Sequence, residues 1–133
     1  MAIPLLFNLT LGASTISYAS TISLSAVNAA PSFPIITITG PINTPVITNT
    51  ATGDKIQFTS NLGGGTVYTI DTRYGYKSIV DASNVSRTNE LSDDSDLSTF
   101  SLQPGDNPIT ITGTSATSAT AIAWQYYKQY ISA

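Results

Sequence analysis

Residues 15–25 read TISYASTISLS, and apolar side chains alternate there with small, mostly hydroxyl-bearing ones at nearly every second position. The apolar positions are Ile16, Tyr18, Ile22 and Leu24. Successive side chains of a β-strand point to opposite faces, whereas helical neighbours recur every three or four residues. The stretch therefore predicts a strand with one face in a hydrophobic core.

The same period of two recurs along the chain. The further strand-like segments are 5–11, 55–59, 68–71, 77–80, 109–112 and 122–126. β-Branched residues dominate them, as pleated and half-buried surfaces favour. No window keeps helical spacing, and only 91–99 is expected to form a short helical turn. Strands at intervals of about ten residues predict an all-β antiparallel sandwich or jelly roll.

Turn-forming residues separate the strand-like segments. Prolines punctuate 31–34 and 41–45, and proline there argues against a central strand because it has no N–H for the ladder. A further turn is predicted at 104–107, since proline presets φ and glycine tolerates positive φ. Its residues are Pro104, Gly105, Asp106 and Asn107.

Composition excludes several classes of site. The 133 residues have the length of one domain. Ser and Thr are abundant, with 17 and 20 copies, while charged residues make up only 10%. The chain has no His and no Cys, so Ser–His–Asp and Cys–His catalysis, thiolate and imidazole metal sites and disulfides are excluded. We predict no cofactor and no metal.

Charge is sparse and unevenly distributed. Five Lys and Arg against eight Asp and Glu give a net charge of −3, which argues against nucleic acid and anionic membranes as partners. No charged side chain precedes Asp54. Either the core and neighbouring subunits cover that end, or Ser, Thr and Asn supply its polarity. The absence of Lys and Arg before Lys55 argues against a secretory signal, and no apolar run is long enough to span a bilayer.

Six elements from residue 31 onward carry a family resemblance. They are PSFPIITITGP (31–41), NTPVITN (43–49), TG (52–53), TIDTRYG (69–75), LQPGDN (102–107) and Trp124 near the end. In this order and spacing, the chain from about residue 20 to 133 resembles the C-terminal domain of siphovirus distal tail proteins, a phage tail component family.

The resemblance implies a galectin-like β-sandwich in the virion's tail tip or baseplate, made in the bacterial host cytoplasm. Its implied partners are other phage tail proteins, and a homo-oligomer within the virion is expected. We expect this sequence to have no counterpart of the family's ring-forming N-terminal half. We therefore expect a docked module, with residues 1–18 as an arm or added strand and 19–133 as the sandwich.

The first segment is also an interface candidate. An uncharged extended strand suits β-augmentation, in which main-chain hydrogen bonds supply the affinity. Its candidate interface residues are Leu5, Phe7 and Leu9. At the other end, Tyr127 and Tyr130 are interface candidates, because tyrosine is enriched in interfaces.

The same aromatic end supports an alternative function, a carbohydrate-binding module that adsorbs the virion to host-surface glycan. Trp124, Tyr126, Tyr127 and Tyr130 resemble a platform for stacking sugars. Against this, Trp124 lies beside Ile122 in a strand pattern, which favours a place in the core.

The polar motifs each have two interpretations. Arg73 either contacts a ligand or pairs with an acid to fix its hairpin, with Gly75 providing backbone freedom; we favour the second. The acidic segment 93–96 either binds calcium or caps a turn, and it lacks the glycine and distal glutamate of an EF-hand.

Glu90 is the only glutamate, and nothing in the spacing pairs it with Asp71 or Asp81 as in a glycosidase. We predict a structural tail protein and not an enzyme.

Overall fold

The computed structural model describes residues 3–11, 15–24, 29–73, 75–93, 95–117 and 119–130. For 3–11, 15–20, 24, 29–30 and 127–130 the description covers the backbone. Within this part, the strands are β1 (Ile3–Leu11), β2 (Thr15–Leu24), β3 (Ala29–Ala30), β4 (Ile35–Thr39), β5 (Ile42–Asn49), β6 (Asp54–Gln57), β7 (Asn61–Leu62), β8 (Val67–Asp71), β9 (Ser78–Asp81), β10 (Gly105–Thr114) and β11 (Thr120–Tyr130). A short 3-10 helix, η1, spans Thr88–Glu90.

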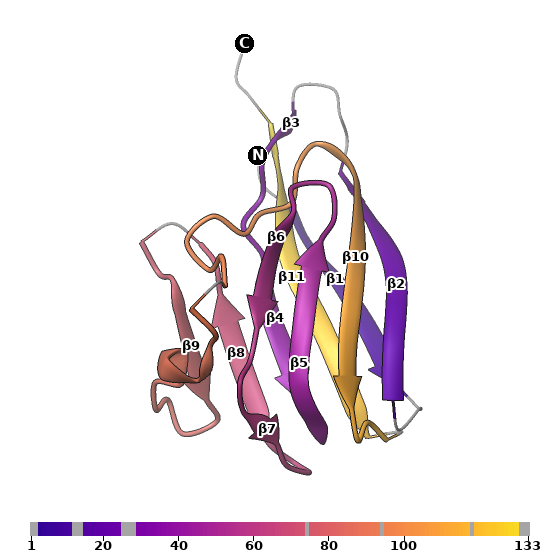
Figure 1. The fold of residues 1–133 in the computed structure, drawn as a ribbon. Coiled ribbons are helices and arrows are strands. Elements are labelled where there is room, and N and C mark those ends of the chain that lie inside the picture. Colours follow the sequence, from indigo (N-terminus) through magenta and orange to yellow (C-terminus); the bar gives the residue numbers. More distant parts are fainter. Residues whose placement is uncertain are drawn as a thin grey trace.

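The strands form two antiparallel sheets that face each other (Figure 1). The first has the order β1-β11-β4-β8-β9, with β3 also paired to β11. The second has the order β2-β10-β5-β6, with β7 also paired to β5. The chain passes from one sheet to the other at six connections, namely β1–β2, β2–β3, β4–β5, β7–β8, β9–β10 and β10–β11. This wrapping is that of a jelly roll. The predicted all-β antiparallel sandwich is confirmed, while its likeness to galectins stays a prediction.

Inward-facing side chains, at every second position of the strands, fill the space between the sheets. Every second residue of β4 and β8 is buried, and in β2 the buried Ile22 lies between the exposed Thr21 and Ser23. Among the buried hydrophobic residues of the described part, those with at most 1% exposure are Ile36, Ile38, Ile42, Ile47, Ile56, Phe58, Leu62, Ile70, Ile79, Phe100, Leu102, Ile122 and Trp124. The period of two that identifies the strands in the sequence therefore also identifies the core.

β1 lies within the segment 1–18 that the sequence sets apart as an arm or added strand. It is the outermost strand of the first sheet, and it pairs with β11 of the same chain from Ile3↔Lys128 to Leu11↔Thr120. β2 is likewise the outermost strand of the second sheet and pairs with β10. The division into an arm and a separate sandwich stays a prediction.

One local expectation, on proline in central strands, is wrong. Pro45 is buried in β5, which lies inside the second sheet between β10 and β6. A bulge accommodates it: Thr44 has φ 44°, and the β5–β10 register shifts between Thr112 and Thr114, so no ladder N–H is required at the proline. At the end of the segment 91–99, where a short helical turn is expected, the Phe100 N–H donates to the Asp96 carbonyl at 2.8 Å and closes one turn. The 3-10 helix Thr88–Glu90 is a separate element just before this segment.

Gly40, between β4 and β5, allows two backbones to approach closely. A Cβ at this position would lie 2.3 Å from the Gly63 carbonyl oxygen and 2.9 Å from that of Leu62. Because both are backbone atoms, the clash cannot be relieved by rotating a side chain. We expect Gly40→Ala to lower the free energy of unfolding by about 1–3 kcal/mol in urea titrations. Gly64→Ala is the control, since nothing lies within 4 Å of its Cβ; equal effects of the two substitutions would contradict this packing.

Candidate functional site

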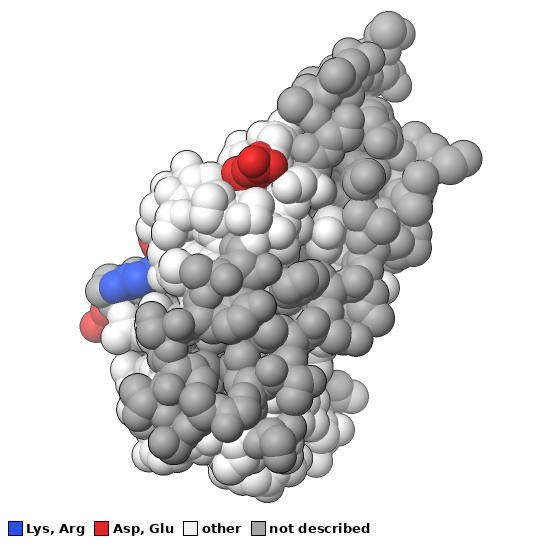
Figure 2. Space-filling model, turned by 90° about the vertical axis from the view of Figure 1, so that its right-hand side faces the viewer, with Lys and Arg blue, Asp and Glu red and all other residues white. Residues whose placement is uncertain are grey.

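The two lateral sides of the sandwich differ in charge. On one side lie β1 and β2, within the first 53 residues, which contain no charged side chain. Most charged residues belong to β6, β8, β9 and the segments that follow them, on the opposite side (Figure 1). Figure 2 shows the β1/β2 side: among its described atoms, acidic and basic groups occur only near the top and at one margin. The described part of this side, named here the β1/β2 side, is therefore nearly uncharged.

The opposite side is named the charged edge; it comprises β6, β9 and the segment 81–96. At its centre two carboxylates share one guanidinium. Arg87 donates from Nε and Nη2 to Asp81 Oδ2 at 3.0 and 2.9 Å, and from Nη1 to Glu90 Oε2 at 3.4 Å. Asp81 Oδ1 also accepts the backbone N–H groups of Ser83 (2.8 Å) and Val85 (3.0 Å). These contacts tie the loop after β9 to the strand itself.

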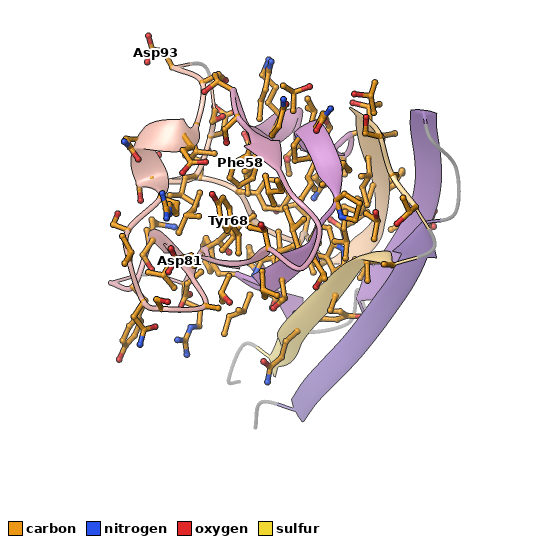
Figure 3. All side chains as sticks on the ribbon, turned by 90° about the horizontal axis from the view of Figure 1, so that it is seen from below. Phe58, Tyr68, Asp81 and Asp93 are labelled. Carbon is orange, nitrogen blue, oxygen red and sulfur yellow. The ribbon has the colours of Figure 1, made fainter. Side chains whose placement is uncertain are left out.

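Glu90 connects this loop to the core. The Tyr68 hydroxyl donates to Glu90 Oε1 at 2.9 Å, and the Ser60 hydroxyl donates to the same oxygen. The Tyr68 ring lies 5.8 Å from that of the buried Phe58, and both rings lie between the sheets in Figure 3. Burial, followed by the bond to Glu90, raises the pKa of Tyr68. The only glutamate is thus held by Arg87, Tyr68 and Ser60.

The acidic segment 93–96 flanks an open pocket of about 440 Å³ on the charged edge. Asp96 Oδ2 accepts the backbone N–H of Lys55 at 3.1 Å, so this carboxylate caps the outer side of β6. Asp93 is exposed and points away from the molecule (Figure 3). Among the described residues, no group of three or more acidic side chains could hold a metal ion.

Arg73 forms a bidentate ion pair with Asp71 at the end of β8. Its Nε donates to Asp71 Oδ1 at 3.0 Å and its Nη2 to Oδ2 at 2.7 Å. The guanidinium carbon lies 4.6 Å from the centroid of the Tyr76 ring, and Gly75 between them has φ 84°. Whether this pair fixes the hairpin or contacts a ligand stays a prediction.

The predicted turn residues 104–107 meet at the start of β10. Gly105 has φ 91°, and the exposed Asp106 accepts the Ser23 hydroxyl of β2 at 2.7 Å. Asn107 is fully buried. It accepts the Gln103 N–H at 2.7 Å and donates to the carbonyls of Gln103 (2.8 Å) and Ile22 (3.1 Å). Asn107 therefore links the turn to β2.

Sequence reasoning missed the partner of Asn107. Asn49, at the end of β5, is also fully buried; it donates to Asn107 Oδ1 at 3.1 Å and to the Ser101 carbonyl at 2.8 Å. Its own Oδ1 accepts the Ala51 N–H at 3.0 Å. The two asparagines join β2, β5, β10 and the segment 101–103. The one signal for Asn49 in the sequence is its place at a strand end, three residues before Thr52-Gly53-Asp54. This signal does not reveal a long-range partner.

The aromatic end divides between core and undescribed side chains. Trp124 is fully buried, Tyr126 is 8% exposed, and the Trp124 ring lies 6.1 Å from that of Phe100. The predicted core position of Trp124 is confirmed, so neither side chain can stack on a sugar. The side chains of Leu5, Phe7, Leu9, Tyr127 and Tyr130 lie outside the described residues. Their backbones pair in register, with Phe7 opposite Trp124 and Leu9 opposite Ile122.

The ion pairs predict acid sensitivity. Burial raises the pKa of Asp71, but its bonds to Arg73 outweigh this, and the pKa lies below the ordinary 3.8. Bonds from the Val85 N–H and Arg87 likewise lower the pKa of Asp81. The native state then binds fewer protons than the unfolded state, so this stabilisation is complete above about pH 4 and is lost as pH falls through the native pKa values.

We expect urea titrations between pH 7 and 2 to show a falling free energy of unfolding below about pH 4. An Asp71→Asn, Asp81→Asn double variant is less stable at pH 7 and shows a flatter decline, because its amides do not titrate. An acid decline as steep in the variant as in the wild type would show that these pairs do not contribute.

The chain matches the model of a known protein family. Residues 27–130 match the family model described as siphovirus-type tail component, C-terminal domain. The matched segment is more than half of the chain and includes β3 to β11. No curated protein sequence and no solved structure gives a significant match.

Proposed function

The chain belongs to the siphovirus-type tail component family through its C-terminal domain, and we propose that it is a structural part of the tail tip or baseplate. A component of a phage tail assembles with other phage tail proteins and is located in the virion. In our proposal the chain is made in the bacterial host cytoplasm and joins the tail as a packed module. Several copies of it are present in each virion.

The observation that carries the proposal is the family match over residues 27–130. The charge distribution supports it, because β1 and β2, like all residues before Asp54, carry no charged side chain. Surfaces that stay in solvent normally carry interspersed charges. A side with so few of them suits permanent contact with a neighbouring protein.

Binding rather than catalysis is the proposed mode of action. Members of the family are structural tail components. Asp81 and Glu90 both bind Arg87 and so stabilise a loop. Among the described residues there is no helix long and apolar enough to cross a membrane.

Glycan binding at the host surface is a second and compatible proposal. Burial of Trp124 and Tyr126 removes half of the aromatic platform. The pocket beside the acidic segment offers a different site, because hydroxyl and amide groups of Thr88, Asn89, Ser95 and Ser98 line it together with Leu91. A glycan array with the wild type and Asn89→Ala tests it: binding lost in the variant supports the pocket, and no binding by the wild type rejects this function.

Mass spectrometry of density-purified virions tests the structural proposal. We expect peptides of this chain in a fixed ratio to those of other tail proteins, and the same ratio after washing at high salt, because an uncharged interface is little affected by screening. Host enzymes carried along by chance provide the control, since washing depletes them. Absence of the chain from washed particles would reject the proposal.

A further inference from the structure

We propose that the outer edge of β2 binds the β2 strand of a second copy of this chain, so that the second sheet continues antiparallel from one subunit into the next. This inference rests on the proposed function and specifies the surface and partner through which the module assembles. It follows from a comparison of the four outermost strands of the two sheets.

On the charged edge, the segment 85–96 covers both outermost strands. Beside β6, Asp96 N donates to the Lys55 carbonyl at 2.7 Å and Ser92 N donates to the Gln57 carbonyl at 2.8 Å. The Ser95 hydroxyl accepts the Gln57 N–H at 2.9 Å. Beside β9, Arg87 N donates to the Ile79 carbonyl at 2.8 Å. These strand edges are therefore closed to a further strand, as native sheets commonly arrange.

The β1/β2 side has no comparable cover in the described part of the chain. There β1 pairs with β11 alone and β2 with β10 alone. β1 carries Pro4 near its start, but β2 spans ten residues with neither proline nor charge. Charged side chains and prolines are the usual protection of an open edge. Of the four outermost strands in the described part, β2 is thus the one that no covering segment, proline or charge protects.

The register identifies which backbone groups β2 offers. Pro108 of β10 lies opposite Thr21; it has no N–H, and its carbonyl accepts the Thr50 N–H at 2.9 Å on the β5 side. Thr21 and Pro108 are therefore a pair without mutual hydrogen bonds, and such pairs alternate with bonded ones. It follows that Ser17, Ala19, Thr21 and Ser23 direct their N–H and C=O groups away from β10.

The occupant follows from the chemistry of this edge. An open strand edge binds an extended strand through main-chain hydrogen bonds. Since β2 has no charge, two β2 strands can meet without repulsion, and an identical strand presents the same spacing of donors and acceptors. A two-fold axis perpendicular to the sheet brings them together antiparallel, which is an isologous contact. β1 borders the same side of the sandwich (Figure 1), so the same axis brings the two β1 strands towards each other.

Analytical ultracentrifugation of the full chain tests the inference. We expect a dimer for the wild type and, for Thr21→Pro, a dimer dissociation constant at least about tenfold higher, because the substitution removes one outward N–H from each copy. Proline is tolerated where the strand N–H faces outward, and far-ultraviolet circular dichroism checks that the monomer stays folded. Thr21→Lys, which places like charges across the pair, is a second variant with the same expected loss.

Thr112→Lys is the matched control, because Thr112 is an exposed threonine of the neighbouring strand β10 and not of an edge; we expect it to remain dimeric. Hydrogen exchange on the wild type should show protected amides at Ala19 and Thr21 in the dimer. A wild-type chain that stays monomeric at millimolar concentration, or unchanged dimerisation of both Thr21 variants, would overturn the inference. Presence in washed virions alongside a monomeric chain would reject this inference alone, whereas absence from virions rejects the proposed function itself.

Discussion

Replacing Trp124 with alanine is expected to lower the free energy of unfolding by about 3–5 kcal/mol, which is a large part of the stability of a domain this size. The side chain is fully buried, packs against the Phe100 ring at 6.1 Å and belongs to β11, whose neighbours on both sides are β1 and β4. Alanine would leave a cavity in the core between the two sheets, beside β11. Urea titration monitored by far-ultraviolet circular dichroism measures the loss.

Two further variants sharpen this prediction. Trp124 Nε1 has no hydrogen-bond partner among the described residues, so Trp124→Phe removes an unsatisfied donor along with some volume and should cost clearly less than alanine. Tyr76→Ala, at a side chain 63% exposed, should change the free energy by less than about 0.5 kcal/mol. A folded, fully stable Trp124→Ala protein that had lost affinity for a glycan would contradict the core position.

Asn107→Leu is expected to lower the free energy of unfolding by about 2–4 kcal/mol. It removes a buried side chain that links three strands and leaves its hydrogen-bond partners unsatisfied. The Asn107 side chain bonds the main chain of Ile22 and Gln103 and accepts from Asn49. All these groups lie where β2, β5 and β10 meet, and an apolar side chain offers them neither donor nor acceptor. The same urea titrations measure this loss.

Asn107→Asp tests the same hydrogen-bond network by its dependence on pH. The carboxylate keeps the acceptor but loses the donor to the carbonyls of Ile22, Gln103 and Gly105. Burial should raise the pKa of this new carboxyl, so the native variant binds a proton that the unfolded chain has released. The stability deficit of Asn107→Asp relative to the wild type should therefore shrink as the pH falls from about 7 to 5.

Asp106→Asn is the matched control for Asn107→Asp. Asp106 is adjacent in sequence but exposed, and asparagine can still accept the Ser23 hydroxyl that Asp106 binds. We expect a change of less than about 0.5 kcal/mol. If Asn107→Leu changed the free energy of unfolding as little as this control, the hydrogen bonds of Asn107 would not contribute to stability.

Alternation in the sequence predicts β1, β2, β6, β8, β9, β10 and β11 and their core positions, because the core requires alternation. It does not single out the inner strands β4 and β5, which lie among the prolines of residues 31–45. Ile22, Ile70 and Ile122 all fall on predicted inward positions and are buried. Pro45 is an exception to the rule against proline in central strands, because a bulge at Thr44 accommodates it. That bulge depends on how β5 pairs with two neighbouring strands at once. That arrangement is a property of the sheet, which no local pattern contains.

The candidate site was harder to predict for the same reason. Asn107 is identifiable as a turn residue, but its partner Asn49 lies 58 positions away in sequence. Arg87 likewise pairs with Asp81 and Glu90 only because the loop after β9 returns along that strand. The lack of charge in residues 1–53 is visible in the sequence, yet only the fold reveals that β1 and β2 lie together on one side while segment 85–96 covers the other.

Cryo-imaging of intact virions tests the central claim most directly. We predict density for this two-sheet domain at the tip of the tail, in contact with neighbouring subunits and repeated with the symmetry of the tail. A complete tail reconstruction in which every domain is accounted for by other chains would contradict it.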